Sequence, residues 1–115
     1  MVVINPGNPT GQVLNEESIQ GIIKFCYNNK IAIIADEVYQ ENIYKKDAKF
    51  VSFRNVMQKL EAPFNTVDLF SFHSTSKGLL GECGMRGGFV KLTNIQTEVN
   101  YIKKLKTNEA NQINN

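Results

Sequence analysis

The chain has 115 residues, of which 13 are basic and 11 acidic, so its net charge is +2. A charge this small gives no indication of a nucleic acid or an anionic membrane as a partner. The composition, 42% hydrophobic and 21% charged, excludes wholesale disorder and is typical of a globular protein. No apolar run approaches the roughly 18 residues that a membrane span requires. We therefore expect one globular domain at most, with no membrane and no nucleic acid as partner.

Cys26 and Cys83 are the only thiols in the sequence. They lie far apart, match no metal-binding spacing and are too few for a disulfide scaffold. The first residues do not combine a basic segment with a long apolar one, as a secretory signal would. We therefore expect two reduced thiols, no metal site and a cytoplasmic location.

The first part of the chain passes from a strand pattern to a helical one. Residues 2–4 are a β-branched run, and residues 5–11 hold two prolines and two glycines, which predicts a tightly turned loop. Asn15 is a suitable helix N-cap, because acidic residues follow it in the first turn. The predicted helix ends at Asn28-Asn29. Its buried stripe comprises Ile19, Ile22, Ile23 and Cys26, widened by Phe25 and Tyr27.

The rest of the chain continues this alternation. Residues 31–35 are apolar on both faces, which predicts a central strand covered by helices on each side. Residues 51–60 carry apolar side chains at helical spacing. The remaining predicted segments are a polar loop over 39–49, a strand over 67–72, a loop over 74–84, a short strand at 88–90, a helix over 94–106 and a polar tail over 107–115.

The order strand, helix, strand, helix, strand favours an α/β layered sheet with mostly parallel strands. In such sheets ligands bind beyond the carboxyl ends of the strands. Asn8 follows the first strand, Asp36 ends the second, and Lys77 lies just beyond the third. Singly, each of them is as well interpreted as a turn or surface residue. Their common placement at one edge of the sheet predicts a binding site.

Four short motifs follow one another along the chain. They are Asn8-Pro9-Thr10-Gly11, Asp36-Glu37-Val38-Tyr39, Ser74-Thr75-Ser76-Lys77 and Arg86-Gly87-Gly88. In this order they resemble the signatures of the class I/II aminotransferases, fold-type-I enzymes that depend on pyridoxal 5′-phosphate (PLP). The segments around the first and last motifs resemble most the alanine aminotransferase branch. The resemblance extends from Val2 to about Lys106 and implies a three-layer αβα large domain.

The resemblance implies roles for Lys77 and Asp36. PLP needs a lysine amine to form an internal aldimine, and the same amine can then move a proton at the substrate α-carbon. Lys77 matches this catalytic, cofactor-binding lysine. The pyridine nitrogen of PLP needs a fixed carboxylate to stay protonated. Asp36 matches that carboxylate.

The resemblance also implies the remaining cofactor-binding residues. Asn8 and Tyr39 match the family's hydrogen-bond donors to the phenolic O3′ of the ring. Ser74 and Arg86 match two partners of the phosphate, where the planar fork of an arginine grips oxygens in pairs. The two glycines after Arg86 allow a close approach of the backbone.

Two residues beside the motifs are given no catalytic part. Glu37 follows Asp36 directly, so in an extended chain its side chain points to the other face. His73 is a lone histidine, and such a residue is more often a structural hydrogen-bonding group than a catalytic one.

The reaction that the resemblance implies is transfer of the amino group of L-alanine to 2-oxoglutarate, giving pyruvate and L-glutamate, in an enzyme that is homodimeric at full length. Residues 1–106 then form the central part of the PLP-binding large domain. Parts of the family's site that lie upstream and downstream have no counterpart in the sequence. We therefore do not expect this 115-residue fragment to be active alone, and a mitochondrial location stays open if a leader precedes it.

Two alternatives remain at this point. The first is another PLP-dependent enzyme of the same superfamily, a lyase or a synthase, because the lysine, aspartate and arginine serve the cofactor rather than one reaction type. The second is an inactive truncated fragment with no catalysis of its own.

Overall fold

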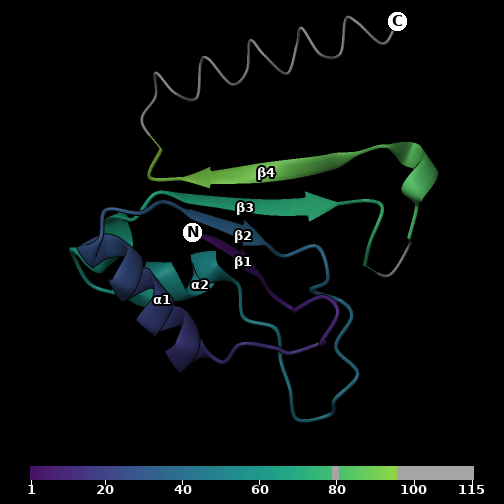
Figure 1. Ribbon diagram of the computed structural model, residues 1–115, viewed down its shortest axis with the longest axis horizontal. Coiled ribbons are helices and arrows are strands. Elements are labelled where there is room, and N and C mark those ends of the chain that lie inside the picture. The colour runs from purple at the N-terminus through teal and green to yellow at the C-terminus, as the bar shows by residue number, and fades with distance from the viewer. Residues whose placement is uncertain (79–80, 96–115) are drawn as a thin grey trace, which may run out of the picture.

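A four-stranded mixed sheet forms the centre of the computed structural model, which describes residues 1–78 and 81–95 (Figure 1). The strand order is β1-β2-β3-β4; the first three strands are parallel to one another, and β4 is antiparallel to β3. The described elements are β1 (Val2–Ile4), α1 (Glu16–Asn28), β2 (Ile33–Asp36), α2 (Phe53–Lys59), a 3-10 turn η1 (Phe64–Thr66), β3 (Leu69–Ser74), a 3-10 turn η2 (Cys83–Met85) and β4 (Gly88–Thr93). The predicted α/β class with a mostly parallel sheet is confirmed.

Helix α1 begins and packs largely as its sequence predicts. The Asn15 side chain accepts a hydrogen bond of 2.8 Å from the Ser18 N–H, which caps the helix. Ile19, Ile23 and Cys26 are fully buried. The prediction that Phe25 widens this stripe is wrong, because Phe25 lies more than half a helical turn beyond Ile23 and is half exposed.

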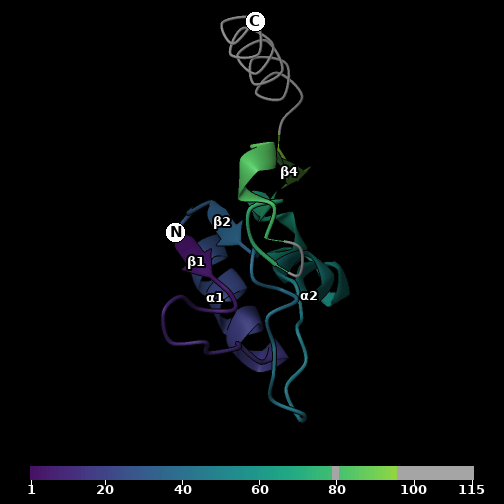
Figure 2. The same ribbon diagram turned by 90° about the vertical axis from the view of Figure 1, so that its right-hand side faces the viewer.

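The hydrophobic core lies between the sheet and the two helices. It joins Ile33, Ala35 and Leu69 of the sheet to the buried side chains of α1 and to Phe53, Val56 and Met57 of α2. Figures 1 and 2 show α1 and α2 on the same side of the sheet. The sequence predicts helices on both faces of β2. Among the described residues, helices cover only one of these faces. On the other side Ile34 and Phe72 are 38% and 40% exposed.

The three parallel strands end at the same edge of the sheet. Ile4 pairs with Asp36, and Asp36 pairs with Phe72. Strand β3 runs two residues further than predicted, to Ser74, because β4 pairs with it up to Gly88. The loops that follow β1, β2 and β3 therefore leave from the same end, on the right in Figure 1, where β4 begins.

The last predicted segments, the helix over 94–106 and the tail over 107–115, lie almost entirely outside the described residues. Strand β4 continues to Thr93, three residues beyond the predicted short strand. Asn94 then adopts a left-handed conformation, and its side-chain amide donates to the Asn65 and Val67 carbonyls at 2.8 and 2.9 Å. Within the described chain, no helix has the length and apolar character needed to cross a membrane, and neither Cys26 nor Cys83 forms a disulfide.

Gly88 allows the close approach of β4 to β3. A Cβ atom at this position would lie 2.6 Å from the His73 carbonyl oxygen, which real Cβ atoms do not tolerate. We predict that Gly88→Ala lowers the free energy of unfolding by about 1–3 kcal/mol, measured by urea denaturation. Gly21→Ala in α1 is the matched control, because nothing lies within 4 Å of its added Cβ, and it should stabilise by up to about 1 kcal/mol. Equal midpoints for Gly88→Ala and the parent would contradict the prediction.

Candidate functional site

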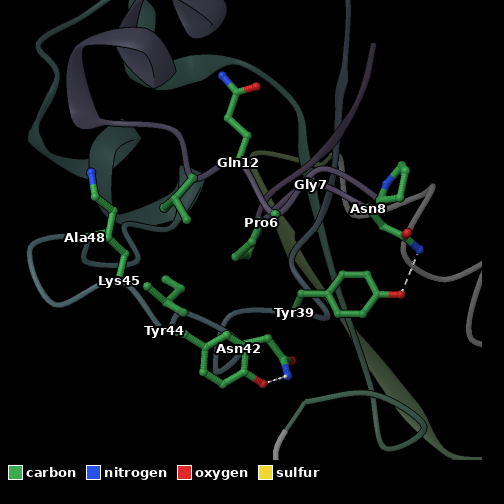
Figure 3. Close-up of a pocket in the computed structure, with 13 residues that line it drawn as sticks. Pro6, Gly7, Asn8, Gln12, Tyr39, Asn42, Tyr44, Lys45 and Ala48 are labelled. Carbon is green, nitrogen blue, oxygen red and sulfur yellow. Dashed lines mark hydrogen bonds between the residues drawn. The ribbon is translucent and has the colours of Figure 1, made fainter.

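The loop after β1 presents Asn8 beside Tyr39. Buried Asn5 anchors this loop, because its backbone N–H donates to the Asp36 carbonyl at 3.0 Å and its Oδ1 accepts from Leu14 N–H at 3.0 Å. Asn8 Nδ2 donates to the Tyr39 hydroxyl at 3.0 Å, as the dashed line in Figure 3 shows. Since the Tyr39 oxygen accepts this bond, its own proton remains available. The pair presents two hydrogen-bond donors side by side.

Asp36 ends β2 on the face of the sheet that the helices do not cover. Ile33 and Ala35 point into the core, so the pleat turns Asp36 to the opposite face. There it lies between Ile4 and Phe72 of the neighbouring strands and is half-buried. Its Oδ1 accepts a long hydrogen bond of 3.4 Å from Val38 N–H. This leaves a fixed carboxylate with acceptor capacity beside apolar side chains.

The turn after β3 carries Lys77. Ser74 Oγ accepts from Ser76 N–H at 3.1 Å, so the serine hydroxyl keeps its own proton for a further partner. Gly78 has a φ of 70°, and a Cβ there would lie 3.8 Å from the Val38 carbonyl oxygen. The turn therefore lies against the segment between Asp36 and Tyr39. Lys77 itself is exposed, and no ion pair links it to another described residue.

Arg86 reaches the same edge from the start of β4. Thr75 N–H donates to the Gly87 carbonyl at 3.0 Å, and Cys83 Sγ contacts the Ser76 carbonyl at 3.2 Å. These contacts hold the η2 turn against the turn that carries Lys77. Arg86 adopts φ 48° and ψ 40°, and its Nη1 donates to the Cys83 carbonyl at 3.2 Å. The other guanidinium donors of this exposed side chain remain available.

A cavity adjoins the candidate site but does not contain all of it. It has a volume of about 610 Å³ and lies between the loop of residues 6–13 and the loop of residues 39–48 (Figure 3). Asn8 and Tyr39 line it, whereas Asp36, Ser74, Lys77 and Arg86 do not. We base the site on the strand ends rather than on this cavity, because the strand register brings all six predicted residues to one edge. Among these six, Asn8 and Tyr39 make the one direct hydrogen bond that the described residues show.

The chemistry of these groups fits PLP. A phenolate oxygen requires donors, and Asn8 and Tyr39 supply two. A pyridinium N–H requires an anionic acceptor, and Asp36 offers one on a rigid strand end. A phosphate requires hydroxyl and guanidinium donors such as Ser74 and Arg86. In the described part of the chain, no group of His, Cys, Asp or Glu residues is arranged to hold a metal ion.

Glu37 has a structural role that sequence reasoning did not assign. It is buried at 7% exposure and accepts a hydrogen bond of 2.8 Å from Phe53 N–H at the start of α2. Burial raises the pKa of the Glu37 carboxyl. The Phe53 N–H and the nearby Ser71 hydroxyl oppose this rise, although the Ser71 hydroxyl makes no hydrogen bond with another described residue. The expectation that Glu37 points away from Asp36 agrees with this position. Its burial could have been inferred from the alternation of faces, but its partner on α2 could not.

Fold and site together define an α/β protein in which a lysine, a carboxylate and a pair of amide and phenol donors meet at the carboxyl ends of parallel strands. The model of the family "Aminotransferase class I and II" matches residues 1–110. The chain belongs to this family.

Several known proteins are similar to the chain over most of its length. Glutamate–glyoxylate aminotransferase 1 of Arabidopsis thaliana is 52% identical over 100 residues, which cover 86% of this chain and 21% of that protein. Alanine aminotransferase 1 of Rattus norvegicus is 48% identical over 100 residues, which cover 86% and 20%. The chain thus spans about a fifth of the length of these relatives.

Solved structures agree with the fold. An aminotransferase from Escherichia coli superimposes with a TM-score of 0.69 at 30% identity, over 84% of this chain and 22% of that chain. A PLP-bound putative aminotransferase from Clostridium difficile gives a TM-score of 0.70 over 99% of this chain and 26% of that chain. The second shares 20% identity and therefore supports the fold alone.

The raised pKa of Glu37 predicts a pH dependence of stability. Between the unfolded and folded pKa values the folded state binds more protons, so stability falls as the pH rises through the folded pKa. Glu37→Gln keeps an acceptor for Phe53 N–H but removes the charge, so this part of the pH dependence should vanish. Urea denaturation of both proteins, from below the ordinary glutamate pKa of 4.5 up to neutral pH, measures the difference. Parallel stability curves for parent and variant would contradict the assignment.

Proposed function

We propose that this chain is the lysine-bearing centre of a PLP-dependent transaminase that moves the amino group of L-alanine to 2-oxoglutarate and yields pyruvate and L-glutamate. The observation that supports the proposal most is the meeting of Lys77, Asp36 and the Asn8–Tyr39 pair at one sheet edge in a member of the aminotransferase class I and II family. Residues 1–106 are proposed as the central part of the PLP-binding large domain.

Lys77 is the proposed catalytic residue. When bound, PLP supplies an aldehyde that condenses with an amine, with loss of water, and a ring that stores an electron pair. The Lys77 amine is proposed to bind the aldehyde carbon and, once displaced by the amino-acid substrate, to take the proton from the substrate α-carbon. Exposure of Lys77 leaves its amine accessible for both tasks.

The other five residues are proposed to hold and orient the cofactor. Asp36 keeps the proton on the pyridine nitrogen, because its ionised carboxylate accepts a charge-assisted hydrogen bond from the ring N–H. Asn8 and Tyr39 donate to the phenolate oxygen. Ser74 and Arg86 hold the phosphate, where the available hydroxyl proton and guanidinium N–H groups suit its oxygens.

The names of the relatives support two choices of substrate. The 48% identity to the rat alanine aminotransferase supports L-alanine as the amino donor. The 52% identity to the Arabidopsis protein supports glyoxylate as an acceptor and glutamate as a donor, which is the second candidate. Both are transaminations between an amino acid and a 2-oxo acid and require the same cofactor-binding residues.

We propose that the enzyme is a homodimer at full length and acts in the cytoplasm. The two cysteines, neither of which forms a disulfide, support a cytoplasmic location. Relatives that are named as mitochondrial, such as the probable alanine aminotransferase of Dictyostelium discoideum, support the mitochondrial alternative.

Covalent labelling tests the role of Lys77. If Lys77 Nζ binds PLP, borohydride reduction should fix a pyridoxyl group on Lys77, and peptide mass spectrometry should find it there. Lys77→Ala should lose this label. Lys91→Ala is the matched control, because Lys91 is another exposed lysine, on β4, and its loss should not affect labelling of Lys77. Labelling spread evenly over the lysines would contradict the proposal.

A chimeric enzyme tests the reaction. The 100 aligned residues of this chain would replace the matching segment of the rat alanine aminotransferase 1, of which they cover about a fifth. We expect conversion of alanine and 2-oxoglutarate to pyruvate and glutamate, and a loss of at least about 10³-fold in kcat with Lys77→Ala in the chimera. Parallel assays with glutamate and glyoxylate test the second candidate. A folded, PLP-loaded chimera that eliminates rather than transfers the amino group would favour the lyase alternative.

A further inference from the structure

A hydrogen-bonded histidine joins the ends of β2 and β3. His73 Nδ1 accepts from the Ser74 backbone N–H at 2.7 Å, and His73 Nε2 lies 3.1 Å from Gln40 Nε2. Gln40 follows Tyr39 in the loop after β2, and Ser74 opens the turn that leads to Lys77. One imidazole ring thus contacts the two segments that carry most of the candidate site.

The Ser74 N–H needs the ring because the sheet ends at this point. Thr75 N–H points to β4 and donates to Gly87, so the alternation along a strand turns the Ser74 N–H towards β2. The last ladder bond on that side runs from Glu37 N–H to the Phe72 carbonyl at 3.2 Å. The Glu37 carbonyl, the next acceptor along β2, instead accepts from Gln40 N–H in a turn. His73 Nδ1 therefore replaces the missing strand partner of Ser74.

This arrangement fixes the tautomer of His73. An Nδ1 that accepts a hydrogen bond carries no proton, so in the neutral ring the proton is on Nε2. The contact with Gln40 then requires the amide oxygen to face the ring, which exchanges the Oε1 and Nε2 positions of that side chain. The Phe89 ring lies 5.3 Å from the His73 ring and restricts its rotation. Glu37, Arg54 and Lys91 line the same cavity of about 220 Å³ as His73 and are the charged groups that face it.

We infer that His73 is a positioning residue for the cofactor-binding turn. Its Nδ1 fixes the backbone from which Ser74 and Lys77 project, and its Nε2–H couples that turn to the loop of Tyr39. The proposed role of His73 is to act through Ser74 rather than to contact the cofactor or the substrate. The link to PLP rests on the proposed function, whereas the link to the Ser74 backbone does not.

The unmodified chain gives the first test. Nitrogen-15 NMR of the histidine ring should show Nδ1 unprotonated and Nε2 protonated at neutral pH, and His73 is the one histidine in the sequence. Hydrogen exchange should show the Ser74 amide protected, although no strand pairs with it on that side. A proton on Nδ1, or a Ser74 amide that exchanges as fast as an exposed one, would overturn the inference whether or not the chain binds PLP.

A pair of variants separates the two nitrogens of the ring. His73→Asn places an amide oxygen near the position of Nδ1 and should keep the protection of Ser74, whereas His73→Gln places it near Nε2 and should lose that protection by about tenfold or more. The Leu69 amide at the start of β3, far from the ring, is the internal reference and should be unchanged in both. If PLP labels Lys77, reduction by borohydride should label it about tenfold less in His73→Gln than in His73→Asn.

The outcomes distinguish the inference from the proposed function. Unchanged Ser74 protection in both variants, with Leu69 also unchanged, would show that Nδ1 does not hold the Ser74 N–H and would overturn the inference. A different pair of results is loss of Ser74 protection only in His73→Gln, together with no labelling of Lys77 even in the parent. These results would support the role of His73 at the backbone and overturn the proposed function.

Discussion

The common register of the three parallel strands is the constraint on which the candidate site depends. Ile4, Asp36 and Phe72 lie opposite one another, so β1 and β2 end together, β3 ends two residues further on, and all three loops leave from one edge. Strand β4 is antiparallel and begins at that edge, which brings Arg86 to the same place. A slip of one residue would turn Asp36 towards the helices. Burial of Ile33 and its core neighbours therefore also determines which side chains face the site.

Two adjacent carboxylates illustrate how this constraint assigns different roles. Asp36 and Glu37 are the same type of group, but the pleat of the strand sends them to opposite faces of the sheet. Asp36 stays half-buried at the open face with acceptor capacity, whereas Glu37 is buried and bonded to Phe53 N–H. Burial accordingly raises the pKa of Glu37, which serves the junction with α2 rather than the site. Position along the pleat, rather than residue type, separates the chemistry of the two.

Apolar periodicity was sufficient to predict the parallel part of the fold and the edge where the site lies. Ile19, Ile23 and Cys26 are buried as their spacing predicts, and Asn8 and Asp36 follow their strands as expected. The direction and full length of β4 could not be predicted. Its pairing with β3 depends on the close approach of Gly88 to the His73 backbone, and no hydrophobic pattern in the sequence indicates this approach. Contacts such as those of Gln40 with His73 depend on how loops turn after the strands end, and hydrophobic spacing carries no information on them.

The end of the sheet explains why the site is held by backbone contacts. Where a strand pairing stops, its N–H and C=O groups lose their ladder partners, and burial makes an unpaired group costly. The segments at this edge supply the missing hydrogen-bond partners. The same hydrogen bonds therefore pair the backbone groups and position the functional side chains. The bonds that do this run from Asn5 N–H to Asp36, from Gln40 N–H to Glu37, from Ser74 N–H to His73 and from Thr75 N–H to Gly87. Each of these bonds lies within three residues of a proposed cofactor-binding residue, so weakening any of them should displace the site before it unfolds the core.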